Sequence, residues 1–166
     1  LEKVRSDPDI RAGNQMMETP VFLDSEDVED LSFLEFHVKQ SHNLVLLLTP
    51  GFLSRPWCLA EIVFAFRNNV HIVPVEIQRV GLNFGYPSEE DYDKIGKGDN
   101  LTVEAKRILE TRQIKLDEVE AALRHSFEKV ALTFSPHKSI GIRTAEVERI
   151  VDRFGSNIRM LSARSH

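Results

Sequence analysis

The amino-acid sequence predicts an α/β fold in which a mainly parallel sheet carries helices on both faces. Short apolar runs alternate along the chain with longer segments whose apolar residues recur every three or four positions, which is the pattern of strand–helix–strand units. The run Asn43–Thr49 is apolar without alternation, as in a strand buried on both faces of a parallel sheet. With 166 residues, the chain is long enough to bury a core of its own. We expect one domain over residues 1–157 and a polar tail over residues 158–166.

Four apolar runs predict the strands. Each is short, rich in aliphatic or β-branched residues and bounded by turn residues. In order they are Thr19–Leu23, Asn43–Thr49, Val70–Ile77 and Val130–Phe134. Because Pro74 lacks the backbone N–H that a sheet ladder needs, we expect the third of them to lie at an edge or to miss a ladder bond.

Six segments with helical spacing of their apolar residues predict the helices. They are Leu31–Gln40, Ser54–Arg67, Ser88–Ile95, Leu101–Arg112, Leu116–Phe127 and Thr144–Phe154. We expect Ser54 to cap the second helix, with Pro56 in its first turn, and Thr144 to cap the last. Glycine and proline punctuate the stretch 78–100, which predicts loops around the third helix.

Composition argues against several classes of protein. Lys and Arg number 21 against 26 Asp and Glu, which gives a net charge of −5, whereas a nucleic-acid-binding protein usually carries a basic surplus. The longest apolar runs are much shorter than a membrane span, and no secretory signal is recognisable. The single cysteine, Cys58, favours a reducing compartment such as the cytoplasm. The six histidines lack metal-binding spacing, so we expect neither a metal site nor a bound cofactor.

Three consecutive segments resemble one known family. They are VFLDSEDVEDL from Val21, SHNLVLLLTPGFLSRPWCLAEI from Ser41 and NNVHIVPVEI from Asn68. In this order the segments resemble a TIR (Toll/interleukin-1 receptor-like) domain, and they are most similar to the TIR-like domains of plants and unicellular eukaryotes. The resemblance implies a flavodoxin-like three-layer fold, a cytoplasmic signalling role such as innate immunity, and self-association or binding to other TIR domains.

The chain departs from the family at its beginning. The central first strand of a TIR domain carries a Phe-x-Ser-Tyr/Phe-like motif, and no such motif is recognisable before Thr19. We therefore expect that strand either to be missing from the chain or to have diverged, and any substrate contact that it supplies in the family is not carried over.

Glu61 is the candidate catalytic residue. At helical spacing Trp57, Glu61 and Phe64 form one stripe, while Cys58, Ile62, Ala65 and Phe66 form another, which we expect to face the core. The helix follows a strand, so its first turns lie at the carboxyl edge of the sheet, where open α/β sheets bind ligands. There a carboxylate can stabilise an oxocarbenium-like ribose. The other interpretation is a solvated glutamate beside a half-buried Trp57.

The resemblance adds a reaction and further contacts to this site. Similar TIR domains cleave NAD with a glutamate at this motif position, releasing nicotinamide and ADP-ribose or a cyclised product. In this chain the resemblance implies Glu61 as the catalytic residue, with Trp57, Ser54 and Asp24 contacting the substrate.

The acidic loop from Asp24 to Leu31 has three interpretations, and the first is that its carboxylates bind a cation or line a pocket. As a solvated connection, it caps the next helix through Asp27 or Asp30. By resemblance it corresponds to a loop that TIR domains use in self-association, which makes Glu26, Asp27 and Asp30 candidate interface residues.

Three functions are therefore open at the level of sequence. The first is a TIR-like NAD nucleosidase, and the second is a non-catalytic module that signals through TIR–TIR contacts. The third, a flavodoxin-like receiver domain, needs a phosphorylated carboxylate at a strand end, for which only Asp24 is a candidate.

Overall fold

The computed structural model describes residues 34–163, and the side chains of residues 34–154. The chain divides into two compact units, Leu1–His37 and Val38–His166, and the fold below is that of the second unit. Helix α4 (Leu34–Gln40), which confirms a helix in this region, crosses the boundary between the units. The expected strand Thr19–Leu23 lies outside the described residues.

Within the described residues, the second unit is built on a parallel sheet of three strands, β1 (Asn43–Leu48), β2 (His71–Ile77) and β3 (Leu132–Phe134). Their order across the sheet is β1-β2-β3. Leu46 lies opposite Pro74 in the first pair of strands, and Val75 lies opposite Leu132 in the second. These three strands and their parallel pairing confirm the predictions for this part of the chain.

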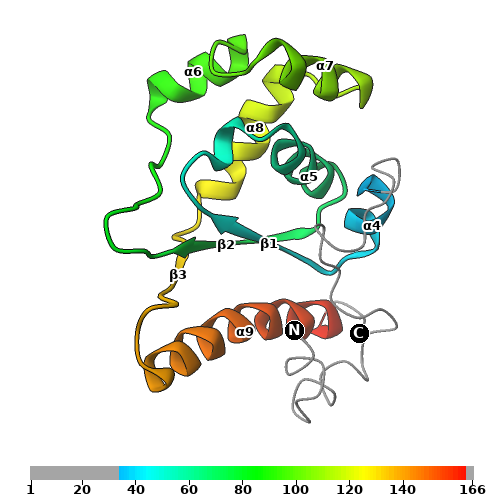
Figure 1. Ribbon diagram of the computed structural model, residues 1–166. Helices are drawn as coiled ribbons and strands as arrows, with labels where there is room; N and C mark the ends of the chain where they lie inside the picture. The colour runs from blue at the N-terminus through cyan, green and yellow to red at the C-terminus, as the bar shows by residue number, and fades with distance from the viewer. Residues whose placement is uncertain (1–33, 164–166) are drawn as a thin grey trace. The chain divides into compact units, whose positions relative to one another are not determined.

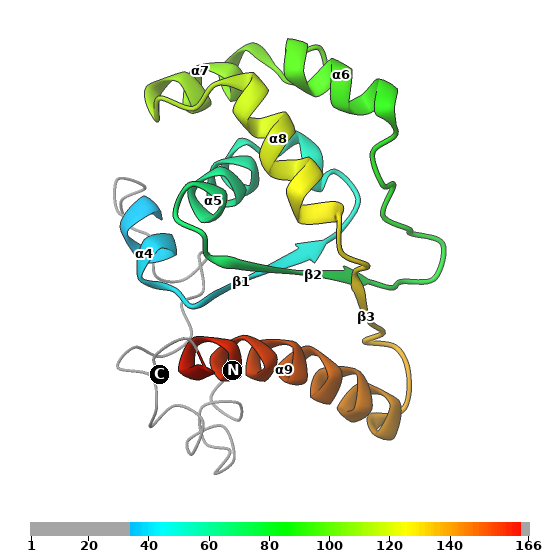
Figure 2. The same ribbon diagram turned by 180° about the vertical axis from the view of Figure 1, so that it is seen from behind.

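Helices cover both faces of the sheet (Figures 1 and 2). On one face lie α5 (Pro56–Arg67) and α8 (Leu116–Phe127), and on the other lies α9 (Ile140–Ala163). Two shorter helices complete the first layer, α6 (Glu89–Lys97), which packs on α8, and α7 (Val103–Thr111), which packs on α5. The predicted three-layer α/β arrangement is thus confirmed.

The layer between the sheet and α5 holds the core. Leu46 and Leu48 of β1 are buried, whereas Val45 and Leu47 are exposed, so β1 turns one face inward and the expected burial of this strand on both faces is wrong. From α5, Leu59, Ile62 and Val63 are completely buried. Each such side chain contributes roughly 1.5–3 kcal/mol when it leaves water, so this layer supplies much of the stability of the unit.

Pro74 does not place its strand at an edge. Strand β2 is central in the described sheet and pairs with β1 from His71 to Glu76. The expected edge position is therefore wrong. Pairing with β3 begins at Val75, one residue after the proline, so the proline precedes the first pairing position on that side.

The caps of two helices differ from the prediction. The N-cap of α5 is Arg55 rather than Ser54, and no side-chain hydrogen bond caps this end. Pro56 at the first helical position removes one of the N–H groups that a cap would satisfy. Helix α9 begins at Ile140, before the expected Thr144, and the Ser139 carbonyl accepts the N–H of Arg143.

Helix α9 also continues past its expected end at Phe154 to Ala163, into the stretch predicted to be a polar tail. Gly155 does not stop it, since a glycine inside a helix costs only about 1 kcal/mol relative to alanine. The sequence offers no proline beyond that point.

An ion pair joins the end of α5 to the start of α8. The Arg67 guanidinium donates to both carboxylate oxygens of Glu118 at 2.7 Å and to the Gln113 carbonyl at 2.8 Å. These hydrogen bonds hold the pKa of Glu118 below its usual value, Arg67 being the main cause. Because Arg67 binds Glu118 through two hydrogen bonds, the pair restricts the angle between α5 and α8 more than a single hydrogen bond does.

We predict that Glu118→Gln lowers the free energy of unfolding by about 1–2 kcal/mol at pH 7, because the amide oxygen can accept only one of the two Arg67 hydrogen bonds and the amide NH2 group cannot accept the other. The pKa of Glu118 is depressed on folding, so its contribution is present above the unfolded pKa and lost as pH falls through the folded pKa. Urea titrations of both proteins from pH 7 to pH 3 should therefore converge at acid pH. Glu110→Gln, at an exposed position on α7, is the control. Equal stability of Glu118→Gln and the unmutated protein at pH 7 contradicts the prediction.

Candidate functional site

The candidate residues lie on α5, immediately after the carboxyl end of β1. The chain turns at Gly51, whose φ of 78° is the left-handed conformation that glycine adopts most easily. A short 3₁₀ helix, η2 (Phe52–Ser54), leads into α5. Trp57 therefore lies in the first turn of α5 and Glu61 in the second, at the sheet edge that the sequence predicts.

The expected stripes on α5 are only partly correct. Trp57 and Glu61 are half-buried, but Phe64, expected beside them, is 2% exposed and belongs to the core. On the expected core stripe Ile62 and Ala65 are buried, whereas Cys58 and Phe66 are half-buried. The core also includes Leu59, Ala60 and Val63, which spacing alone did not select.

The reason for this difference is that α5 has more than one neighbour. It packs against α7 and α8 as well as the sheet, so apolar residues are buried around most of its circumference. The sequence does indicate that α5 is buried on most sides, because Glu61 is the only charged residue between Trp57 and Phe66. A helix that is apolar almost all round is usually a buried one.

Trp57 has an unexpected cationic neighbour. The guanidinium carbon of Arg112, which follows the last residue of α7, lies 6.0 Å from the centre of the Trp57 ring. This is the outer limit for a cation–π contact. It places a positive charge near the first turn of α5, within the region that holds Glu61. No local motif indicates this pair, since 55 positions separate the residues in sequence.

The other predicted contacts are not gathered around Glu61. Ser54 is exposed and its hydroxyl donates to the Gly51 carbonyl at 2.7 Å, a local bond within the turn. Asp24, Glu26, Asp27 and Asp30 lie outside the described residues. The structure therefore brings together Trp57 and Glu61, with Arg112 in addition.

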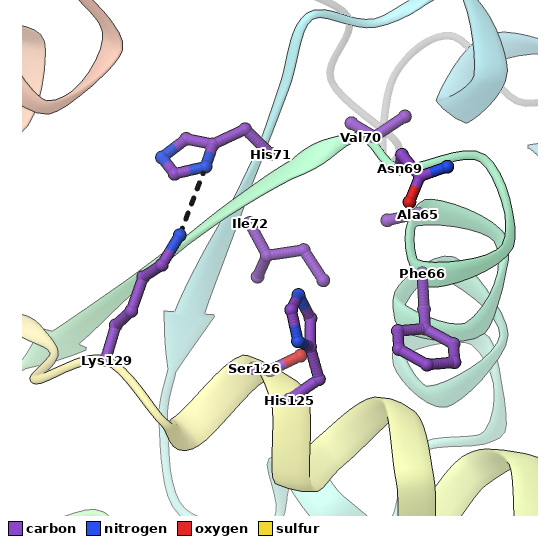
Figure 3. A pocket seen from close by; sticks show the side chains of 9 residues that line it. All are labelled: Ala65, Phe66, Asn69, Val70, His71, Ile72, His125, Ser126 and Lys129. Carbon is purple, nitrogen blue, oxygen red and sulfur yellow. Dashed lines mark hydrogen bonds between the residues drawn. The ribbon is translucent and has the colours of Figure 1, made fainter. Parts of the chain in front are cut away.

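A cavity of about 190 Å³ lies at the other end of the sheet (Figure 3). Its lining comes from the end of α5, the start of β2 and the end of α8, and consists of Ala65, Phe66, Asn69, Val70, His71, Ile72, His125, Ser126 and Lys129. Neither Trp57 nor Glu61 contributes to it. The sequence analysis did not select this region, in which His71 is half-buried.

A second polar cluster joins the carboxyl ends of β2 and β3 to α9. Glu146 is 8% exposed and accepts the backbone N–H of Ser135 at 2.7 Å and its hydroxyl at 3.0 Å. The same hydroxyl lies 3.3 Å from Oε1 of Gln78. Ser135 is completely buried, so this cluster serves to attach α9 to the sheet.

Neither a metal site nor a membrane span emerges from the described part of the chain. No group of three or more His, Cys, Asp or Glu side chains within residues 34–163 is arranged to hold a metal ion. Of the helices within these residues, none is long and apolar enough to cross a membrane.

Comparison with known proteins gives a structural likeness only. No family model matches the sequence, and no curated protein matches it. Among solved structures, a match is found to the TIR domains in the structure of the activated Roq1 resistosome directly recognizing the pathogen effector XopQ. That chain is 15% identical, with 92% of this chain and 93% of that chain covered and a TM-score of 0.45. At these values the likeness carries no argument about function.

We predict that Phe64→Ala lowers the free energy of unfolding by about 3–5 kcal/mol, because it leaves a cavity in the core. Glu61→Gln, one turn earlier on the same helix, should lower it much less, because this change removes no side-chain volume from the core. Urea unfolding of both variants measures the difference. A mild effect of Phe64→Ala contradicts the assignment of this side chain to the core.

Proposed function

We propose that this chain is a TIR-like signalling domain. The observation that carries the proposal is the position of the motif residues in the fold. The Trp57–Glu61 segment occupies a helix that directly follows the strand β1, and the IVPV segment lies in the neighbouring parallel strand β2. This is the order in which the resembling segments occur in TIR domains. The parallel sheet with helices on both faces agrees with the fold that the resemblance implies.

Signalling by such a domain rests on contacts with other copies of the chain or with other TIR domains, in the reducing cytoplasm. The acidic residues Glu26, Asp27 and Asp30 are the proposed interface, on the strength of the resemblance. A surface of this charge suits a basic partner patch, because exposed opposite charges steer association.

NAD cleavage is the second candidate function, and the pairing of Trp57 with Glu61 favours it. Both are half-buried and four residues apart on one helix, so the indole can shield the carboxylate partly from water. In the proposed reaction the glycosidic bond breaks, nicotinamide leaves with the bonding electron pair, and Glu61 stabilises the positive charge on the ribose. Water then supplies the hydroxyl of ADP-ribose. Arg112 is suitably charged to attract the pyrophosphate.

For the enzymatic candidate we predict that Glu61→Gln lowers the rate of NAD cleavage at least about a hundredfold, roughly 2.7 kcal/mol of transition-state stabilisation. Nicotinamide release by the full chain at high protein concentration is the measurement. Glu110→Gln, an exposed carboxylate on α7, is the matched control and should keep the unmutated rate.

Two results decide against the enzyme. If the unmutated chain releases no nicotinamide even when clustered, or if Glu61→Gln cleaves NAD at the unmutated rate, the enzymatic function is wrong. The proposal of an interaction module does not depend on either result, because it requires association alone.

For the interaction module we predict that charge reversal at Glu26 and Asp27 changes self-association and leaves the thermal midpoint almost unaltered. Substitutions at surface positions usually change stability by no more than about 0.5 kcal/mol. Sedimentation velocity and thermal unfolding of the same double variant provide both readouts. A large fall in the midpoint instead identifies the loop as a structural element, and unchanged association removes it as the interface.

A further inference from the structure

Two buried polar atoms on neighbouring strands have no hydrogen-bond partner among the described residues. They are Oδ1 of Asn43 on β1 and Nε2 of His71 on β2. The two residues lie directly opposite each other in the parallel pair of strands, so their side chains project from the same face of the sheet. Buried polar atoms are rarely left without a partner, which marks this pair as a site that needs an explanation.

Lys129 determines which nitrogen of His71 carries the proton. Its ammonium lies 3.4 Å from Nδ1 of the imidazole (Figure 3). An ammonium can only donate, so Nδ1 must be the acceptor and the ring must be neutral with its proton on Nε2. The buried Nε2–H is then a donor, and the buried Oδ1 of Asn43 beside it is an acceptor. No direct hydrogen bond joins these two atoms in the structure.

The surroundings of His71 in the described part of the chain favour the neutral ring. From the segment between α8 and β3 it faces Lys129, from α9 it faces Arg153, and from β1 it faces the uncharged Asn43. Burial is the main cause that lowers the pKa of His71 below 6.5, followed by the charges of Lys129 and Arg153. From α8, His125 lines the same cavity, but its Nδ1 lies 3.6 Å from the carboxylate of Glu128.

We propose that His71 is a pH-sensitive latch: the neutral imidazole holds Lys129 against β2, and protonation releases Lys129 and loosens the segment 128–131 that leads into β3. Protonation places a hydrogen on Nδ1, where it points at the Lys129 ammonium. The hydrogen bond becomes a contact between two donors, and three positive charges then share the site. Because Lys129 is exposed, its side chain can move into solvent, and we expect it to do so when His71 is protonated.

The direction of the pH dependence follows from linkage. A histidine whose pKa is lowered on folding binds its proton more readily in the unfolded state. Stability therefore falls as pH decreases from the unfolded pKa of about 6.5 towards the lowered folded pKa, and becomes constant below it. The latch is closed at neutral pH and opens in mildly acidic solution.

Nuclear magnetic resonance titration of the full chain tests the first step. We expect the His71 ring to titrate below the usual histidine value of 6.5, and Lys129→Gln to raise the pKa of His71 because one repelling charge is removed. If His71 titrates at or above 6.5, or if Lys129→Gln leaves its pKa unchanged, the latch is wrong.

Hydrogen exchange, expressed as protection factors to remove the intrinsic pH effect, tests the second step. Between pH 7.5 and a pH below the measured pKa of His71, protection in residues 128–131 should fall about tenfold for each unit by which the pKa is lowered. His71→Gln should abolish this fall, and His125→Gln, a matched change in the same cavity, should preserve it. Equal behaviour of the two variants overturns the proposal. If His71→Gln does not fold, the comparison of Lys129→Gln with His125→Gln gives the same decision, because only the Lys129 change should reduce the fall.

Discussion

The enclosure of α5 is the constraint on which the rest of the unit depends. This helix packs on the parallel sheet and also contacts the helices α7 and α8, and its buried residues occupy most of its circumference. Such enclosure demands apolar side chains nearly all round, and it leaves few positions where a charge can be tolerated. Glu61 occupies one of them. Glu61 is half-buried, so the neighbouring elements do not cover it completely. The position of this candidate carboxylate is thus a consequence of packing.

The parallel sheet was predictable because its signals are local. The run Asn43–Leu48 has no polar interruption, and turn residues bound each strand within its own segment. Pairs that depend on distant parts of the chain were not predictable. The cation–π contact of Arg112 with Trp57 and the ion pair of Arg67 with Glu118 join residues about 50 positions apart, and spacing rules describe only neighbours along one element.

The candidate site likewise combines features that local sequence patterns predict with features that depend on distant parts of the chain. Placing Trp57 and Glu61 at the carboxyl edge required only the order of strand and helix, and the structure agrees. The stripe that included Phe64 failed because a single amphipathic face was assumed for a helix with several neighbours. The cavity at the amino edge escaped the sequence analysis for a different reason. It is formed by the ends of three elements, where no periodic pattern exists to reveal it.

The attachment of α9 to the sheet also determines how the unit would respond to force. Strand β3 pairs with β2 over only three residues. The carboxylate of Glu146 accepts hydrogen bonds from the backbone N–H and the hydroxyl of Ser135, the residue that follows β3. A pull directed along α9 is therefore transmitted through Glu146 to the shortest strand of the described sheet. Because the few ladder bonds of β3 would bear that load together, this strand and its helix should detach first and as one mechanical element, while β1, β2 and α5 remain assembled.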